Sequence, residues 1–367
     1  MVCRHAGPWG SVMIDGGDTR VPVTLLTGFL GSGKTTLLNN LLNALELADT
    51  AVIINEFGEV AIDHLLVEQV NENLRLLQSG CLCCTVRGDL VDTLSDLYER
   101  RGRGEIQSFS RVIIETTGLA DPTPVLQTFL IDPQIAPYFR LEQVVTTIDA
   151  VNGMSTLDRH REAVRQVSMA DCLLLTKGDI ASGQVLNALE VRLKNINPAA
   201  RILPVVEGAI AVDELFSDGA RQRSFDFDAY VDHAEKGLSV PHHQEAGVSS
   251  HCLITDVPLP RDRLLYWLEL MAGLRGENIL RVKGIVQTVE SPDQPTIVHG
   301  VQEVFHASRQ LPSWPTTDHR SKIVFIVQGI EYSEIVRTFE KFVGVKLPAF
   351  TPIARDASGA TSRKLKK

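Results

Sequence analysis

The sequence predicts an α/β protein in which a mostly parallel sheet is covered by helices on both faces, followed by a smaller α+β domain. Two observations carry this prediction. Apolar runs rich in Val, Ile and Leu recur from residue 21 onward, and segments with helical spacing of apolar residues stand between most of them. A long polar stretch then separates this block from a second one with its own strand and helix patterns.

The first block is expected to alternate strands with helices. Because its strands are apolar throughout rather than alternating, both faces of their sheet must be buried, and that is the arrangement of a parallel sheet. The predicted strands are 21–28, 50–56, 111–118, 141–150, 170–179 and 201–207, and the predicted helices include 34–47, 86–100, 159–168 and 184–194.

The chain of 367 residues is long enough for two domains, since a single hydrophobic core rarely grows beyond about 250 to 300 residues. The second block is predicted to hold strands at 252–259, 278–289 and 322–330 and amphipathic helices at 261–272 and 332–343. The expected division is a flexible arm at 1–20, a first domain at 21–216, a linker at 217–247, a second domain at 248–352 and a basic tail at 353–367.

Composition excludes several classes of protein. The formal net charge of -9 and the pI near 5.6 argue against a nucleic-acid-binding protein, which draws on a surplus of Lys and Arg. No apolar stretch approaches the ~18 residues that span a bilayer, and the N-terminus lacks the apolar core of a signal peptide. We therefore expect a cytoplasmic protein with no membrane partner, whose cysteines stay reduced and are available for metal binding or catalysis.

A phosphate-binding motif directly follows the first predicted strand. The segment GFLGSGKTT satisfies the P-loop pattern with Gly28, Gly33, Lys34 and Thr35, and the helical stretch TLLNNLLNAL comes after it. In such a loop main-chain N–H groups face the β- and γ-phosphates, the lysine supplies positive charge and the threonine hydroxyl reaches Mg²⁺. The fold class is therefore that of a P-loop NTPase, which needs a nucleotide and Mg²⁺.

Two further strand ends carry candidate nucleotide-binding residues. Glu115 ends the strand of RVIIETTGLADP, where it would support Mg²⁺ or its water shell, and Gly118 would let the backbone follow the γ-phosphate. After a later strand, Thr176-Lys177-Gly178-Asp179 approaches the N-K-x-D pattern, in which the aspartate accepts the two donors that guanine presents. GTP is thus expected rather than ATP, with Thr176 departing from the usual Asn.

The stretch GCLCC places Cys81, Cys83 and Cys84 within four positions. Three thiolates from one loop can converge on a metal and leave the fourth position open, which suits an ion that is exchanged rather than stored. Soft thiolates select Zn²⁺ or Cu(I), with Co²⁺ and Ni²⁺ left open. The alternative is that these are half-buried small residues, as we expect for Cys172 within its apolar run.

Read in order, these motifs resemble those of the CobW-type family of GTP-dependent metallochaperones, in the CobW/HypB/UreG superfamily of P-loop GTPases. The resemblance covers residues 21–216 densely and reaches about residue 352. The segments that carry it are GFLGSGKTT at 28–36, INEFGEV at 54–60 with Asp63, GCLCC at 80–84, ETTGLADP at 115–122, TKGD at 176–179, KGIV at 283–286 and the block at 299–314.

The resemblance implies GTP binding and slow hydrolysis, with zinc, or cobalt as an alternative, carried at the thiols and delivered to a client metalloprotein. A homodimer is compatible with it. By matching motif, the phosphates belong to Gly28, Gly31, Ser32, Gly33, Lys34, Thr35 and Thr36, Mg²⁺ to Thr35 and Glu115, guanine to Thr176, Lys177 and Asp179, catalysis to Lys34 and Glu115, and the transition metal to Cys81, Cys83, Cys84 and Glu59.

The acids and histidines near these motifs have two interpretations each. In the functional interpretation, Glu56 and Glu59 are additional metal ligands or switch residues. In the other, they are two exposed acidic residues of a loop. A group of histidines near Cys252 either gathers metal or stands as exposed loop side chains. These histidines are His233, His242, His243 and His251.

The order of motifs also suggests how metal and nucleotide are linked. INEFGEV and GCLCC lie between the phosphate loop and Glu115, the part of a GTPase chain that the γ-phosphate orders and hydrolysis releases. Metal affinity is then expected to depend on the nucleotide, and nucleotide affinity on the metal. No water-positioning residue is evident, so intrinsic turnover is expected to be low.

Other functions share some of these features. A small-molecule kinase with a P-loop would use ATP and an acceptor pocket, and a metal sensor or store would keep the nucleotide fold as a relic. Within the metallochaperone class, cobalt delivery to cobalamin synthesis or activation of an enzyme such as nitrile hydratase competes with zinc supply.

Overall fold

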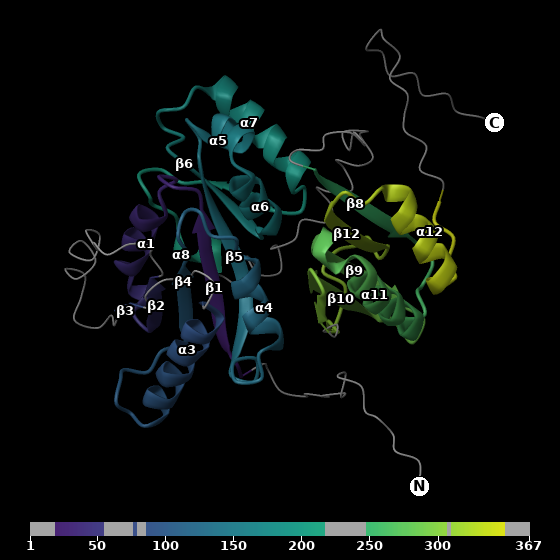
Figure 1. The fold of residues 1–367 in the computed structure, drawn as a ribbon, viewed down its shortest axis with the longest axis horizontal. Helices are drawn as coiled ribbons and strands as arrows, with labels where there is room; N and C mark the ends of the chain where they lie inside the picture. The colour runs from purple at the N-terminus through teal and green to yellow at the C-terminus, as the bar shows by residue number, and fades with distance from the viewer. Residues whose placement is uncertain (1–18, 55–75, 79–85, 217–246, 307–309, 349–367) are drawn as a thin grey trace.

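The computed structural model describes residues 19–54, 76–78, 86–216, 247–306 and 310–348. They form two sheets (Figure 1): a seven-stranded sheet in the order β3-β2-β4-β1-β5-β6-β7 and a five-stranded sheet in the order β11-β10-β9-β12-β8. Every strand pair in the first sheet is parallel, and every pair in the second is antiparallel. The predicted fold class, a P-loop α/β domain followed by a smaller α+β domain, is confirmed.

The first strand of the chain, β1, lies at the centre of the parallel sheet. β1 lies between β4 and β5, so the strand order changes direction at the loop that follows β1. Open parallel sheets bind ligands at such a point. The strands are β1 (Val21–Gly28), β2 (Thr50–Ile54), β3 (Leu76–Gln78), β4 (Arg111–Glu115), β5 (Phe139–Asp149), β6 (Cys172–Thr176) and β7 (Arg201–Pro204).

Helices bury both faces of this sheet, as its apolar strands require. One core packs α1 and α8 against one face, through residues such as Leu38 and Leu26. A larger core packs α3 to α7 against the other face, through residues such as Leu126 and Leu25. The helices are α1 (Lys34–Leu42), α3 (Val86–Gly102), α4 (Thr123–Ile131), α5 (Gly153–Arg159), α6 (Arg161–Met169), α7 (Gly183–Ile196) and α8 (Val212–Phe216).

Several element boundaries differ from the sequence prediction. The predicted helix 34–47 ends at Leu42 and continues only as the short 3-10 helix η1 (Leu45–Leu47). β3, α4, α5 and α8 were not predicted. α4 was not predicted because its sequence, TPVLQTFLI, has buried residues such as Leu126 and Phe129 with few polar residues between them. The helical period of apolar residues is therefore not visible.

The antiparallel sheet carries two helices on one of its faces. Its strands are β8 (Val248–Thr255), β9 (Ile279–Thr288), β10 (Ser291–Val301), β11 (Val304–His306) and β12 (Ser321–Gln328). Its two α-helices are α11 (Arg261–Arg275) and α12 (Tyr332–Val343), and the short 3-10 helix η2 (Gly276–Asn278) follows α11. Neither β10 nor β11 was predicted. In β10, Pro292 and Pro295 interrupt the strand pattern, and the structure accommodates them at a register shift between Ser291 and Thr296. β11 is only 3 residues long.

The two sheets share one of the hydrophobic cores. Along β12, Ile323 and Phe325 pack on α11 and α12, whereas Val324 and Ile326 join the larger core of the parallel-sheet domain. Leu280 joins that core as well, at a register shift that places an extra β9 residue opposite β12. Contacts between α6 and β9, α7 and β8, and α4 and β10 or β11 complete this interface. The C-terminal sheet is therefore packed directly against helices of the first domain.

No helix in the part of the chain that the structure describes is both long and apolar enough to cross a membrane.

Candidate functional site

The loop between β1 and α1 has the backbone of a phosphate-binding loop. Gly28, Gly31 and Gly33 have φ values of 140°, 72° and 93°, a region that favours glycine. A Cβ on Gly28 would stand 2.3 Å from the Thr147 hydroxyl oxygen and 2.5 Å from its main-chain oxygen. The glycine at this position is thus required by both conformation and space.

Lys34 and Thr35 begin α1 and point their side chains at neighbouring elements. Lys34 Nζ donates to the main-chain oxygens of Gly28 at 2.9 Å and Phe29 at 3.3 Å, so its charge lies against the loop. Thr35 Oγ1 donates to Glu115 Oε1 at 3.1 Å. Glu115 ends β4 beside β1 and is 5% exposed. A hydroxyl and a carboxylate at this distance are the oxygen ligands that Mg²⁺ prefers, so Thr35 and Glu115 fit the ion.

The loop that follows Glu115 lies against the phosphate loop. Thr116 Oγ1 donates to Thr27 Oγ1 at 2.8 Å, and the main-chain N–H of Thr116 donates to Leu26. Gly118 comes so close that a Cβ there would stand 2.6 Å from the main-chain nitrogen of Leu30. The loop 116–122 is therefore in direct contact with the segment expected to surround the γ-phosphate.

Thr176, the residue that departs from the N-K-x-D pattern, is joined to the phosphate loop. Its hydroxyl lies 2.7 Å from the main-chain oxygen of Ser32 and 3.1 Å from that of Ile148, and it is 5% exposed. Ser32 Oγ in turn lies 2.6 Å from Thr147 Oγ1. In this arrangement the Thr176 hydroxyl joins the end of β6 to the phosphate loop.

Those two residues, Lys177 and Asp179, stand at the end of β6. Lys177 has φ 58°, which is uncommon for a non-glycine residue, and its Nζ donates to Gly31 O at 2.9 Å and to Asp149 Oδ2 at 2.7 Å. Burial raises the pKa of Asp149, but hydrogen bonds from Lys177 and Asn152 outweigh it and hold the pKa below its usual value. Asp179 lies exposed in the following turn, accessible to a ligand.

Sequence reasoning missed two parts of this site. Asp149 ends β5 and fixes Lys177, and its position at the close of an apolar run was the available signal. The turn after β7 lies beside α1, where Asn40 Nδ2 donates to the main-chain oxygen of Glu207 at 2.9 Å. Glu207 and Gly208 have positive φ values of 51° and 75°. Both features stand at the carboxyl edge of the sheet with the predicted residues.

A pocket of about 260 Å³ opens beside the phosphate loop. Phe29, Leu30, Asn152, Gln166 and Lys177 contribute to its lining. One wall is the loop itself, and another is formed by α5 and α6.

The predicted transition-metal ligands lie outside the described residues. These are Cys81, Cys83, Cys84 and Glu59, together with Glu56 and the linker histidines His233, His242 and His243. What the structure describes is the pair of strands that precede the two motifs. Among the residues it covers, no cluster of three or more His, Cys, Asp or Glu side chains is arranged to hold a metal ion.

Three residues singled out as candidates or alternatives have structural roles. His251 lies in β8 rather than in an exposed loop, and its Nε2 lies 3.0 Å from Ile330 O; burial lowers its pKa. Cys252 is half-buried, and burial raises the pKa of its thiol. Cys172 is buried in β6, as expected of a small apolar residue, and burial raises its pKa to about 12.

Comparison with protein families matches both domains. The model described as "CobW/HypB/UreG, nucleotide-binding domain" matches residues 22–204, and the model described as "Cobalamin synthesis protein cobW C-terminal domain" matches residues 248–343.

Individual relatives match most of the chain. The "Zinc chaperone YjiA" of Escherichia coli is 34% identical over 314 residues, which cover 86% of this chain and 95% of that protein. The "Zinc chaperone CobW" of Pseudomonas aeruginosa is 31% identical over 352 residues, which cover 86% of this chain and 90% of its own. The "Zinc-regulated GTPase metalloprotein activator 1" of Dictyostelium discoideum is 29% identical over 319 residues, 76% of this chain and 65% of that protein.

Among solved structures, "Zn(II)-bound YjiA GTPase from E. coli" superimposes with a TM-score of 0.65 at 28% identity. The match covers 88% of this chain and 99% of that one.

Proposed function

Because this chain belongs to the CobW/HypB/UreG family of P-loop GTPases and carries its C-terminal domain as well, we propose that it is a GTP-dependent zinc metallochaperone. It binds zinc at Cys81, Cys83 and Cys84, hydrolyses GTP to GDP and phosphate, and delivers the ion to a client metalloprotein. The relatives named as zinc chaperones and as a zinc-regulated activator support zinc as the cargo.

One observation carries the link between metal and nucleotide. Ile54, the last residue of β2, pairs with Gln78 at the end of β3 and with Glu115 at the end of β4. In a parallel sheet these three strand ends meet at one edge. In the sequence, INEFGEV continues from Ile54 and GCLCC begins two residues after Gln78. Both motifs therefore depart from the sheet next to the carboxylate that would serve Mg²⁺.

The phosphate end of the site is suited to positioning rather than to covalent chemistry. The loop backbone and Lys34 would bind the phosphates, while Thr35 and Glu115 would hold Mg²⁺, which neutralises charge on the phosphates when it is bound. The loop after Glu115 contacts Leu30 through Gly118, so a γ-phosphate bound here would affect the conformation of both segments. Lys177 and Asp179 would contact guanine.

The proposal is tested by measuring zinc affinity with a non-hydrolysable GTP analogue and with GDP. Zinc affinity should differ between the two states, and by linkage zinc should change the ratio of the affinities for the analogue and for GDP by the same factor. Replacing Cys81, Cys83 and Cys84 together by serine should abolish the tight site. Cys252→Ser, which changes a half-buried thiol elsewhere, is the matched control. Equal zinc affinity in both nucleotide states would rule out the switch.

A second function is favoured by the pocket beside the phosphate loop. A small-molecule kinase needs an acceptor site of this kind next to its γ-phosphate, and Phe29, Asn152 and Gln166 would line it. Such an enzyme would prefer ATP. Affinities for GTP and ATP measured side by side separate the two functions, because the metallochaperone requires a preference for GTP.

A further inference from the structure

Helix α6 holds the loop that follows Glu115. From α6, Gln166 Nε2 donates to the main-chain oxygens of Gly118 at 3.2 Å and Ala120 at 3.1 Å. Gln166 is 1% exposed, and its own main-chain oxygen accepts a hydrogen bond from Thr146 of β5. Because the side chain is buried and fixed at its base, the loop 116–122 and α6 are positioned together.

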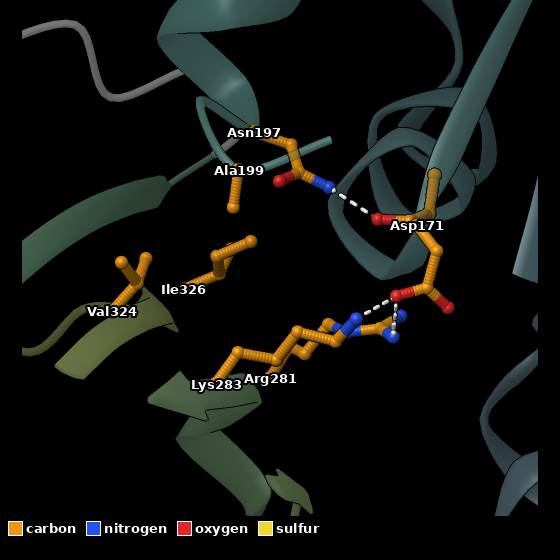
Figure 2. A pocket seen from close by; sticks show the side chains of 8 residues that line it. Asp171, Asn197, Ala199, Arg281, Lys283, Val324 and Ile326 are labelled. Atoms are coloured by element: carbon orange, nitrogen blue, oxygen red, sulfur yellow. Dashed lines mark hydrogen bonds and ion pairs between the residues drawn. The ribbon is translucent and has the colours of Figure 1, made fainter. Parts of the chain in front are cut away.

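The other end of α6 leads to the contact with the C-terminal domain. Asp171, two residues after the helix, is 3% exposed, and its Oδ1 accepts from Arg281 Nη2 at 2.6 Å and from Lys283 Nζ. Arg281, on β9, is 2% exposed. Figure 2 shows both cations reaching the same carboxylate, with Val324 and Ile326 of β12 lining the same small pocket. This cluster of Asp171, Arg281 and Lys283 is the interdomain ion cluster.

Asp171 and the end of α6 are fixed within the first domain. Asp171 Oδ2 accepts from the main-chain N–H of Val144 at 2.8 Å, and the Asp171 N–H donates to Val144 O at 2.8 Å. Asn197, 1% exposed, places Nδ2 within 2.8 Å of Val167 O and 2.9 Å of Ala170 O. A force applied at the ion cluster therefore acts on the last turn of α6 rather than on a loose loop.

A buried ion pair of this kind constrains geometry strongly. Removing one partner leaves a desolvated charge, so the two domains are held at the one separation that keeps Asp171 and Arg281 in contact. Gln166 lies in the last turn of α6, and Asp171 stands two residues after the end of that helix. The placement of the C-terminal domain and the conformation of the loop 116–122 thus share one short, rigid element.

We propose that Gln166 is a positioning residue through which the docked C-terminal domain acts on the loop 116–122, and hence on GTP turnover. This inference rests on the proposed GTPase function and deepens it. A client that binds the C-terminal domain and strains the ion cluster would alter the loop beside the γ-phosphate, and a nucleotide that moves the loop would alter the docking of the domain.

The test is a double-mutant cycle on GTP hydrolysis in the full chain. Arg281→Met should change kcat by roughly threefold or more, the size of a typical coupling, with a smaller effect on KM. In a Gln166→Met background, where the loop is released from α6, Arg281→Met should have no further effect. Coupling through Gln166 requires this non-additivity.

Two matched controls separate the relay from general loss of stability. Gln143→Met removes a buried amide that donates to Leu215 O, away from the loop, so Arg281→Met should keep its effect in that background. Arg140→Met removes one of the two arginines that face buried Glu142 inside the first domain, and it should leave kcat unchanged. Should Arg281→Met fail to fold, Lys283→Met replaces it, since Lys283 is more exposed.

A second measurement tests the relay without catalysis. Amide hydrogen exchange in residues 116–122 should rise in Arg281→Met and not in Arg140→Met. The inference is overturned if exchange there is unchanged, or if Arg281→Met and Gln166→Met act additively on kcat. A wild-type protein without GTP turnover would instead contradict the proposed function, and the exchange result would still decide the relay.

Discussion

The hydroxyl of Thr176 lies 2.7 Å from the main-chain oxygen of Ser32, so the strand that leads to Lys177 and Asp179 is tied to the phosphate loop itself. In the common N-K-x-D pattern an asparagine stands at this position. Here a shorter side chain reaches a loop carbonyl, and any pocket for a base is thereby fixed relative to the pocket for the phosphates.

Removal of that hydroxyl should weaken both stability and nucleotide binding. In Thr176→Val the methyl groups fill the same space, but Ser32 O loses a buried donor, which typically costs about 1 to 2 kcal/mol. We expect the free energy of unfolding to fall by that amount in denaturant titration, and GTP affinity to fall by roughly fivefold or more. Thr176→Ser keeps the donor and should bind GTP nearly as the wild type does; equal affinity in all three proteins would refute the role of the tie.

Gly28→Ala should be among the most damaging single-methyl substitutions in the chain. The new Cβ would meet Thr147 at 2.3 Å and would also occupy a φ of +140°, so we expect a loss of about 2 kcal/mol or more in the free energy of unfolding. Gly102→Ala is the control, because no atom lies within 4 Å of its Cβ position. Urea titration of both variants should show a large shift only for Gly28→Ala.

Thr35→Ala should uncouple nucleotide binding from Mg²⁺. The hydroxyl that donates to Glu115 is the one that fits the ion, so its loss should lower Mg²⁺-supported GTP turnover by roughly tenfold or more. GTP binding measured in the presence of EDTA should change little. Thr35→Ser, which retains the oxygen, should recover most of the turnover across a Mg²⁺ titration.

The interdomain ion cluster should give stability a distinctive pH dependence. Burial lowers the pKa of Lys283 to about 8, although the Asp171 carboxylate opposes that shift. Between about pH 8 and the ordinary lysine value near 10.4, the unfolded chain therefore binds more protons than the folded one at this residue, so the contribution of Lys283 to stability rises with pH.

Lys283→Met should lack that rise. The measurement is the free energy of unfolding of both proteins from pH 7 to 10.5. The wild-type value minus the Lys283→Met value should increase steadily above pH 8. A constant difference across this range would show that Lys283 titrates normally.

The nucleotide-binding half of the fold could be predicted because its signals are local. β1, the loop and α1 lie within one short stretch, where glycine conformation, lysine charge and strand period all indicate the same structure. The roles proposed for Cys81, Cys83 and Cys84 stay predictions, because those residues lie outside the described part of the chain.

The rest depends on contacts between residues far apart in the sequence. Asp171 and Arg281 are separated by 110 positions, and nothing in either neighbourhood indicates the pairing. The guanine contact expected of Thr176 stays a prediction, whereas the bond between its hydroxyl and Ser32 O could not be predicted, because it depends on how the two residues are brought together in space. β10 was missed because two prolines conceal a strand whose neighbour β9 supplies the pairing.

The alternation along β12 bears on whether the two halves of this molecule can be exchanged separately. Ile323 and Phe325 serve one core while Val324 and Ile326 serve the other, so the strand belongs to both halves of the molecule. Exchange of the C-terminal half alone would replace one side of this packed interface and leave the other side, on α6, unchanged. Chimaeric proteins that exchange the C-terminal half are therefore expected to fold well only when β9, β12 and α6 are exchanged as a single unit.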